Sequence, residues 1–416
     1  MRVACCPDGQ AHLGRNLPDV GRAIRYQLED LLRSRIKFIA LLAALALVFA
    51  ACGGDDDAGD DGGATETTAA APETTAAAPD TTAAAPDTTA AAPDTTAAPA
   101  DAALICEVTD VGGVDDKGFN ASAWAGAQRA AADFGAEAKV LESQAETDYE
   151  VNINSFIDQG CNLIVTVGFL LGEATETAAN TNADTAFTIV DFAYEAPPPN
   201  LKGLVFNTDE AAFLAGYVAA GVTQTGKVGT FGGINIPPVT IFMDGFARGV
   251  DYHNAEKGTA VEVLGWDPDT QEGSFTNNFE SLDDGRAFAQ SLVDEGADIV
   301  MPVAGPVGLG SAALASELGT FYIVGVDVDG FEADTNNSAV YLTSVLKRID
   351  NAVYAAADEA LNGTITSDLY IGALANEGVG LAPYHDLQGM VSSELAAEVD
   401  ALAQAIIDGT VSVTGG

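Results

Sequence analysis

Positive charge is scarce in this sequence. The chain has 416 residues, with 17 Lys and Arg against 61 Asp and Glu, and its formal net charge at pH 7 is −44. Seven of the 17 bases lie in residues 1–51, so the remainder is more acidic still. A surface of this sign repels nucleic-acid backbones and anionic lipid head groups. We therefore expect no nucleic-acid partner.

Metal-binding side chains are also few. The chain holds five cysteines and three histidines, and no Cys-x-x-Cys or His-Glu-x-x-His pattern occurs. Zinc sites need such ligand sets, and the acidic clusters lack the spacing of an EF-hand loop. The sequence therefore predicts no metal and no cofactor. Beyond residue 52 four of these side chains remain: Cys106, Cys161, His253 and His385.

Long apolar runs are absent. The longest, residues 38–51, is too short for a confident membrane span, and it follows a basic stretch that begins at Arg33. A basic region, an apolar region and small residues before a cut are typical of a secretory signal. Residues 49–52 (Phe-Ala-Ala-Cys) resemble a bacterial lipobox, which predicts cleavage before Cys52 and lipid attachment to its sulfur. The alternative is an ordinary signal peptide. We interpret residues 1–51 as a signal peptide with an over-long start.

Residues 52–101 have low complexity. A Gly/Asp-rich start is followed by repeats of Ala-Pro-Asp-Thr-Thr-Ala-Ala, with 11 acids and no bases between residues 53 and 101. Such a segment cannot bury a core, and its prolines exclude a continuous helix. We expect a lipid-anchored, disordered linker that holds a folded body away from the membrane.

From residue 102 onward, apolar strand patterns alternate with amphipathic helix patterns. This rhythm predicts an α/β protein with parallel sheets covered on both faces. The rhythm runs to residue 223 and then restarts, which predicts two doubly wound lobes with a cleft between them. We expect the first lobe to hold residues 102–225 and 336–363, and the second lobe residues 226–335 and 364–416. We expect strands at 103–108, 138–141, 162–167, 186–191, 203–206, 227–231, 260–264, 299–303, 322–326, 339–344 and 369–373. Expected helices are 120–134, 148–159, 173–182, 209–223, 238–254, 283–295, 308–318, 348–362 and 393–408.

The stretch 105–124 carries the first indication of a site. An apolar strand passes through a Gly-rich turn into a helix, with Asp115, Asp116, Lys117 and Asn120 where the turn meets the helix. In open α/β sheets ligands bind at the carboxyl ends of strands. The turn is therefore a candidate pocket for a small polar ligand; the alternative is an acidic surface turn.

Eight segments, in order, give a specific resemblance. The sequence resembles the basic membrane protein family of bacterial lipoproteins, which are solute-binding components of ABC importers; the characterised members bind purine nucleosides. The resemblance covers about residues 102–412 and implies a type I periplasmic binding protein fold with three crossovers. It also implies an extracytoplasmic, monomeric, lipid-anchored protein that works with a membrane permease. The segments are 110–126, 167–169, 189–192, 206–220, 227–233, 245–250, 324–330 and 343–350.

The resemblance also implies the ligand contacts. Carboxylates at strand ends would accept hydrogen bonds from the ligand, aromatic rings would stack on a flat heterocycle, and glycines would allow close backbone approach. The implied set is Asp116, Lys117, Phe119, Asn120, Phe169, Asp191, Phe192, Gly232, Gly233, Asp327 and Lys347. One departure is Gly118, which stands where the family commonly has serine, so a hydrogen bond at the helix start is missing.

Two cysteines form a possible disulfide. Cys106 lies in the first expected strand and Cys161 just before the third, and in a sheet of order 2-1-3 these strands are neighbours. An exported protein favours a bridge, and the alternative is two buried thiols.

Four functions remain open at this level, the last of them a signalling partner for a membrane receptor. The first is a nucleoside-binding component of an importer, with no chemical step. The second keeps the fold and binds a sugar or another small polar metabolite. The third is an exported nucleoside hydrolase that uses Asp115 and Asp116 as an acid/base pair. Adjacent residues on a turn rarely aim at one point and no His or Ser partner is evident, so we predict that the protein is not an enzyme.

Overall fold

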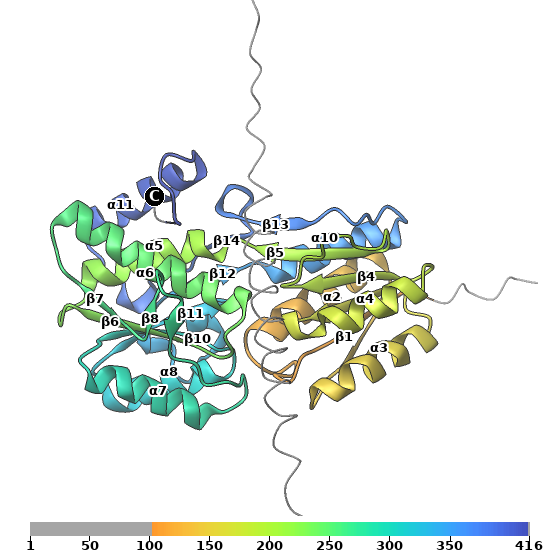
Figure 1. Cartoon of the computed structure of the whole chain (residues 1–416), viewed down its shortest axis with the longest axis horizontal. Helices are drawn as coiled ribbons and strands as arrows, with labels where there is room; N and C mark the ends of the chain where they lie inside the picture. The colour runs from red at the N-terminus through yellow and green to blue at the C-terminus, as the bar shows by residue number, and fades with distance from the viewer. Residues whose placement is uncertain (1–101, 415–416) are drawn as a thin grey trace, which may run out of the picture. The chain divides into compact units, whose positions relative to one another are not determined.

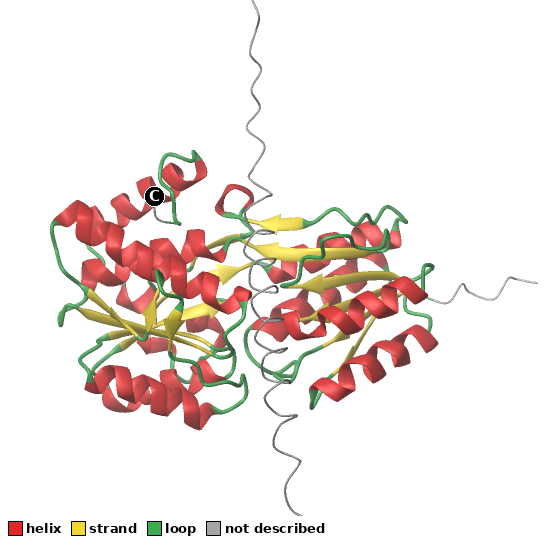
Figure 2. Ribbon diagram, in the orientation of Figure 1, coloured by secondary structure: helices red, strands yellow, loops and turns green. Residues whose placement is uncertain are grey.

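The computed structural model describes residues 102–414 (Figure 1). The predicted signal segment, the Cys52 lipidation site and the linker lie outside these residues. Within the described part, no helix combines the length and the apolar character that a bilayer crossing requires. Strands and helices alternate through most of residues 104–361 (Figure 2).

The first sheet has six parallel strands in the order β13-β5-β4-β3-β1-β2. Helix α2 packs against α10, and α3 packs against α4. The strands are β1 (Leu104–Val108), β2 (Glu137–Leu141), β3 (Leu163–Val167), β4 (Ala186–Val190), β5 (Leu201–Phe206) and β13 (Tyr370–Gly372). The helices are α2 (Phe119–Phe134), α3 (Tyr149–Asp158), α4 (Gly172–Thr181) and α10 (Ile349–Leu361).

The second sheet repeats this plan in the order β14-β12-β11-β10-β6-β7, with β14 alone antiparallel. Its strands are β6 (Lys227–Gly232), β7 (Glu262–Leu264), β10 (Ile299–Val303), β11 (Tyr322–Asp327), β12 (Tyr341–Lys347) and β14 (Val379–Leu381). The helices on this side are α5 (Thr208–Val222), α6 (Pro237–Lys257), α7 (Leu282–Asp294), α8 (Val307–Leu318), α9 (Gly330–Ala333) and α11 (Ser393–Ile407). A short antiparallel ribbon pairs β8 (Trp266–Asp267) with β9 (Glu272–Gly273). Turns of 3-10 helix lie at Glu146–Asp148, Phe169–Leu171, Ser338–Val340, Leu374–Asn376 and His385–Leu387.

The sequence explains why these segments form buried parallel strands. Every residue of β3 and of β10 is buried, and both strands are rich in Val and Ile. Parallel strands covered by helices on both faces need such continuous apolar runs. Helices α2, α6 and α8 each end at a glycine with positive φ, namely Gly135, Gly258 and Gly319. These glycines adopt the left-handed conformation that closes a helix without a Cβ clash.

The chain passes between the two sheets three times. It crosses after β5, after β12 and between β13 and β14, which confirms the predicted two-lobed α/β fold and its three crossovers. Three parts of the predicted lobe assignment are wrong. Helix α5 packs on α6, β12 and β14 of the second lobe, although residues 102–225 were predicted to lie in the first. Residues 341–347 form β12 of the second sheet, although 336–363 were predicted to lie in the first lobe; only the helix of that segment, α10, packs on the first. Residues 370–372 form β13 of the first sheet, although 364–416 were predicted to lie in the second lobe; each lobe takes its sixth strand from the C-terminal segment.

A disulfide joins Cys106 and Cys161, the pairing that the sequence analysis raised, and their Cα atoms are 6.1 Å apart. The bond forms because β1 and β3 are adjacent, with Ile105 opposite Leu163. It ties the centre of the first sheet to the end of α3.

Candidate functional site

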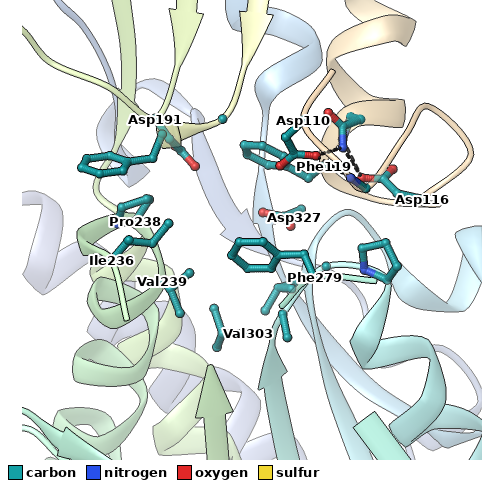
Figure 3. A pocket seen from close by; sticks show the side chains of 18 of the residues that line it. Asp110, Asp116, Phe119, Asp191, Ile236, Pro238, Val239, Phe279, Val303 and Asp327 are labelled. Carbon is teal, nitrogen blue, oxygen red and sulfur yellow. Dashed lines mark hydrogen bonds between the residues drawn. The ribbon is translucent and has the colours of Figure 1, made fainter. Parts of the chain in front are cut away.

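A pocket lies at the carboxyl ends of strands from both sheets (Figure 3). In open α/β folds this is where small-molecule ligands bind. The two lobes line it unequally. The first lobe contributes mainly polar and aromatic residues: Asp110, Asp116, Phe119, Asn120, Phe169 and Asp191. The second contributes a largely apolar wall with two charged groups: Ile236, Pro238, Val239, Phe242, Phe279, Val303, Pro306, Val326, Asp327 and Lys347.

Two aspartates occupy matching places in the lobes. Asp191 directly follows β4, and Asp327 is the last residue of β11; these strands hold the same position in the two sheet orders. Both residues have positive φ, 69° for Asp191 and 68° for Asp327. This backbone conformation is unfavourable for residues other than glycine and is concentrated at functional sites. Figure 3 shows both carboxylates turned toward the pocket.

Asp191 is held by a buried cation. The Lys347 ammonium lies 2.5 Å from Asp191 Oδ2, and both side chains are almost fully buried. Burial raises the pKa of Asp191, and the charge of Lys347 opposes that rise. Lys347 Nζ also lies 4.8 Å from the centre of the Phe119 ring and 5.7 Å from that of Phe242, within the range of cation–π attraction.

Asp327 has no such support. Its carboxylate makes no hydrogen bond or ion pair with any side chain or backbone group of residues 102–414, although the residue is only 8% exposed. Burial raises the pKa of Asp327 to about 7; Lys347 lowers it, and the charge of Asp191 adds to the rise. A buried carboxylate without a partner is costly, and a ligand hydroxyl or N–H that donates to it would offset the cost.

Asp116 is occupied by the start of α2. Its carboxylate accepts hydrogen bonds from the backbone N–H groups of Gly118, Asn120 and Ala121 at 2.7–3.0 Å. It thus caps the helix in place of the serine hydroxyl that Gly118 lacks. Burial raises its pKa and these hydrogen bonds lower it, with burial the larger effect.

Asn120 links Asp116 to a further acid at the pocket wall. Its Nδ2 donates to Asp110 Oδ1 at 2.8 Å and to Asp116 Oδ2 at 3.1 Å. Asp110 Oδ1 also accepts the N–H of Gly112, while Oδ2 makes no hydrogen bond with any residue from 102 to 414. Burial raises the pKa of Asp110 to about 6, although the hydrogen bonds from Asn120 and Gly112 lower it. Asp110 therefore offers a second acceptor to a ligand.

Aromatic rings face the pocket from both lobes. Phe169 follows Gly168, whose φ of 117° turns the chain at the end of β3. The Phe169 ring is supported from behind by Phe192, with ring centres 5.0 Å apart. Phe279 comes from the second lobe and is labelled opposite Phe119 in Figure 3. Rings on two sides suit a flat, partly apolar ligand.

Seven of the 11 ligand contacts expected from the sequence line this pocket, and four do not. Lys117 instead forms an ion pair with Asp334 of the second lobe, at 3.2 Å. Phe192 packs over Gly172, where a Cβ would lie 2.3 Å from its ring. Gly232 and Gly233 make room for the rings of Phe275 and Phe279, which would lie 2.6 Å and 2.3 Å from added Cβ atoms.

Sequence reasoning missed several pocket residues. Asp110 stands just after β1, and the denser group of polar residues in the turn that follows it gave the stronger sequence signal. Phe279 lies in an irregular segment between β9 and α7, where no periodic signal exists. Phe242 is 2% exposed and also lines the pocket wall, and the sequence pattern of a buried helix face does not separate these two roles. The described residues hold no group of three or more His, Cys, Asp or Glu that could hold a metal ion.

The arrangement can bind a ligand from two sides. It has acceptors in Asp110, Asp191 and Asp327, an ammonium group in Lys347, and stacking faces such as that of Phe169. Lys347 lies on β12 of the second lobe and pairs with Asp191 of the first, so the ion pair itself spans the cleft.

Comparison with known proteins agrees with this architecture. The model of the Bmp family, described as ABC transporter substrate-binding protein PnrA-like, matches residues 104–415. Basic membrane protein A of Borreliella afzelii is 31% identical over 307 residues, covering 73% of this chain and 89% of that protein. The CD4+ T-cell-stimulating antigen of Listeria monocytogenes is 30% identical over 331 residues, covering 74% and 87%.

Solved structures show the same fold. An ABC transporter solute-binding protein from Aeropyrum pernix superposes with a TM-score of 0.67 at 25% identity, covering 74% of this chain and 92% of that one. A second, from Conexibacter woesei, gives 0.59 at 26% identity, covering 74% and 98%. The family model matches residues 104–415, and the two lobes with three crossings agree with it. The chain therefore belongs to the Bmp family of PnrA-like ABC transporter substrate-binding proteins.

Proposed function

We propose that this protein captures a purine nucleoside between its lobes and delivers it to the permease of an ABC importer. Membership of the substrate-binding family accounts for the binding role outside the cytoplasm and for a permease as partner. The nucleoside, the lipid anchor at Cys52 and the monomeric state are the further parts of the proposal. Binding and release complete the role, and no chemical step is involved.

The polar side of the pocket supports a ribose. Vicinal hydroxyls are hydrogen-bond donors that need acceptors, and carboxylates are acceptors when ionised. Asp327 presents an unpartnered carboxylate, and Asp191 has one oxygen on Lys347 and a second that makes no hydrogen bond among residues 102–414. Hydrogen bonds to charged acceptors are about twice as strong as those between neutral groups.

The apolar side of the pocket supports a purine base. Phe169 and Phe279 come from different lobes, and the wall near Phe279 includes Val239 and Val303. Stacking of a base on an aromatic side chain contributes about 1–3 kcal/mol, judged from nucleic-acid binding proteins. A sugar alone would leave this apolar wall uncovered. The single observation that carries the proposal is therefore the combination of strand-end carboxylates and facing aromatic rings, from both lobes, in one pocket.

Contacts across the cleft support lobe closure on the ligand. Asp191 with Lys347 and Lys117 with Asp334 both join the first lobe to the second. A ligand that touches both lobes favours the closed arrangement by its differential affinity for that state.

The test has two arms. Native mass spectrometry of the purified protein should show a co-purified mass equal to that of a purine nucleoside. Addition of inosine, guanosine or adenosine should raise the melting temperature by mass action, by an amount that corresponds to about 2.7 kcal/mol at 100 times Kd. Free ribose, free base and arabinose serve as controls. A shift with arabinose and none with any nucleoside would instead establish a sugar-binding protein.

A further inference from the structure

Glu107 is an acid buried in the middle of the first lobe. It lies in β1, is 0% exposed, and neither carboxylate oxygen has a hydrogen-bond partner in the described part of the chain. Its neighbours in the sheet are Val140 on β2 and Val165 on β3, which offer no side-chain donor. A carboxylate ion in such a place carries a large desolvation cost, whereas a protonated carboxyl group does not.

A second unpartnered acceptor lies at the start of the helix that covers β1. Asn120 is 1% exposed, and its Oδ1 is buried without a partner among residues 102–414. The assignment of the amide nitrogen and oxygen follows from its partners, because Nδ2 donates to two carboxylates, those of Asp110 and Asp116. A flipped amide would turn its oxygen toward those carboxylates, so Oδ1 needs a donor from elsewhere.

The fold places these two groups on facing surfaces. Ile105 belongs to the same core cluster as Ala123 and Ala127 of α2, so this face of β1 packs under α2. Side chains on a strand alternate, which turns Glu107 to the same face as Ile105, two residues nearer the carboxyl end. The start of α2 lies near the carboxyl end of β1. A move from Ile105 to Glu107 along the strand therefore corresponds to a move from Ala123 to Asn120 along the helix, about one turn.

From these observations we propose that Glu107 carries a proton and donates it in a hydrogen bond to Asn120 Oδ1. Glu107 then acts as a positioning residue for the ligand pocket, since it fixes the amide that holds Asp110 at the pocket wall. The proton satisfies one acceptor atom of Asn120 and removes a buried charge. An ionised Glu107 would instead face the negative end of the amide.

The electrostatics of the region agree with a neutral Glu107. Burial raises its pKa well above the usual value, and the negative charge of Asp116 adds to this rise. The elements packed against this face carry no compensating cation there: Val140 and Val165 flank it, and the inward residues of α2 are Ala123 and Ala127. Asp116 is therefore the charged group that acts on Glu107 in the described structure.

The first arm of the test does not depend on the ligand. In Glu107→Gln an amide replaces the protonated acid and still donates to Asn120. The folded wild type keeps a proton that the unfolded chain releases above its ordinary pKa near 4.3, so its stability falls as pH rises. The unfolding equilibrium constant of the wild type relative to E107Q should therefore rise about tenfold per pH unit from pH 5 until the folded-state pKa is reached. A ratio that stays constant from pH 5 to pH 8 would overturn the proposal.

An infrared measurement on the wild type covers the case in which the variants fail to fold. At pH 8 the wild type should retain the carbonyl band of a protonated carboxyl group, that of Glu107. Asp110 and Asp327, with pKa values of about 6 and 7, are mostly ionised at this pH and contribute little to the band. Where E107Q folds, it should lack this band. Absence of the band from the wild type at pH 8 would contradict a protonated Glu107.

The second arm rests on the proposed function, because it measures nucleoside affinity. Glu107→Met keeps the volume but removes the donor, which leaves Asn120 Oδ1 unsatisfied and the amide less firmly placed. Nucleoside affinity should fall about tenfold, while E107Q should stay within about twofold of the wild type. Equal affinity for E107M and the wild type would refute the positioning role. If the wild type binds no nucleoside, the proposed function fails, and the pH and infrared measurements still decide on the proton.

Discussion

The two lobes carry an aspartate with positive φ at matching places. Each lies at the end of the strand that is third in its sheet order, counted from β13 in the first sheet and from β14 in the second. These are Asp191 after β4 and Asp327 at the end of β11. The first lobe's aspartate is neutralised by Lys347 at 2.5 Å, whereas the second lobe's aspartate has no partner among residues 102–414. Lys347 lies on β12, the strand next to β11, and yet it pairs across the cleft with the other lobe.

This difference explains how a repeated fold makes an asymmetric site. One aspartate completes a buried ion pair that joins the lobes, and the other remains available to a ligand. The backbone strain at both positions indicates that the surrounding structure holds the two carboxylates in place. The first lobe also has the Cys106–Cys161 bridge, and the described part of the second lobe has no disulfide. The lobe with the disulfide thus contributes most of the polar and aromatic pocket residues, and the other contributes Asp327 and Lys347 within a largely apolar wall.

The largest effect is expected from Lys347→Met. This change leaves Asp191 buried and unpaired, which for buried ion pairs costs about 3–5 kcal/mol of stability, and nucleoside binding should be lost. Urea denaturation gives the stability. The matched control is the double variant Asp191→Asn with Lys347→Met, which has no buried charge at this position and should recover much of the loss. A K347M protein as stable as the wild type would show that the two side chains are not paired.

Removal of the disulfide should have the next largest effect, and it should be confined to the first lobe. The two cysteines are 55 residues apart, and a bridge that closes such a loop contributes about 2–4 kcal/mol. Reduction, or the double change Cys106→Ser and Cys161→Ser, should lower the melting temperature. Hydrogen exchange should rise in β1 and β3 and stay unchanged in β6 and β10. A uniform rise in both sheets would contradict a stabilising effect confined to the first lobe.

Asp327→Asn sharpens the comparison of the two aspartates. The variant loses a charged acceptor, so nucleoside affinity should fall about 10- to 100-fold. Its stability should move the other way. The pKa of Asp327 in the folded protein is about 7, above the unfolded value, so the wild type loses stability as pH rises from about 4 to 7.

D327N should therefore melt above the wild type at pH 8 and close to it at pH 4. Asp191→Asn is the control: it strands Lys347 without a partner, so it should melt below the wild type at pH 8. The two aspartates would prove equivalent if both variants shifted in the same direction.

The smallest effect is expected from Lys117→Ala. The ion pair of Lys117 with Asp334 is partly exposed, with 40% of the Lys117 side chain accessible. Such pairs contribute about 0–1 kcal/mol. We expect affinity to fall by less than about fivefold, with small-angle scattering showing a more open average without ligand. Lys139→Ala, which removes a half-buried lysine whose Nζ donates to Gln159 Oε1 of the same lobe at 3.3 Å, should change neither. A 100-fold loss in K117A would mean that Lys117 contacts the ligand directly.

Much of the fold was predictable from sequence. Runs such as residues 163–167 and 299–303 are continuously apolar, so their strands were predicted within one residue of the observed ends. The strands β8, β9 and β14 were missed because each is two or three residues long and carries no periodic signal. The lobe of β12 was predicted wrongly, because hydrophobic pattern shows that a strand is buried without showing in which sheet.

Part of the candidate site was also predictable from the sequence, and part was not. Asp191, Asp327 and Lys347 were predicted as ligand contacts from the resemblance to the family, and both aspartates also stand where a predicted strand ends. Pairing across the cleft is set by tertiary structure, so the sequence alone did not show that Lys117 contacts Asp334. Phe279 depends on a loop conformation and on space at Gly233, which no local pattern encodes.

Calorimetric titration of guanosine into the wild type and D327N tests the central claim most directly. We predict that the wild type binds guanosine, with affinity that rises from pH 5.5 to pH 8 as Asp327, with a pKa of about 7, ionises to accept the ribose hydroxyls. D327N should bind more weakly and lose most of this pH dependence. Guanosine affinity that is equal in the two proteins at every pH, or no binding of any nucleoside by the wild type, would contradict the account.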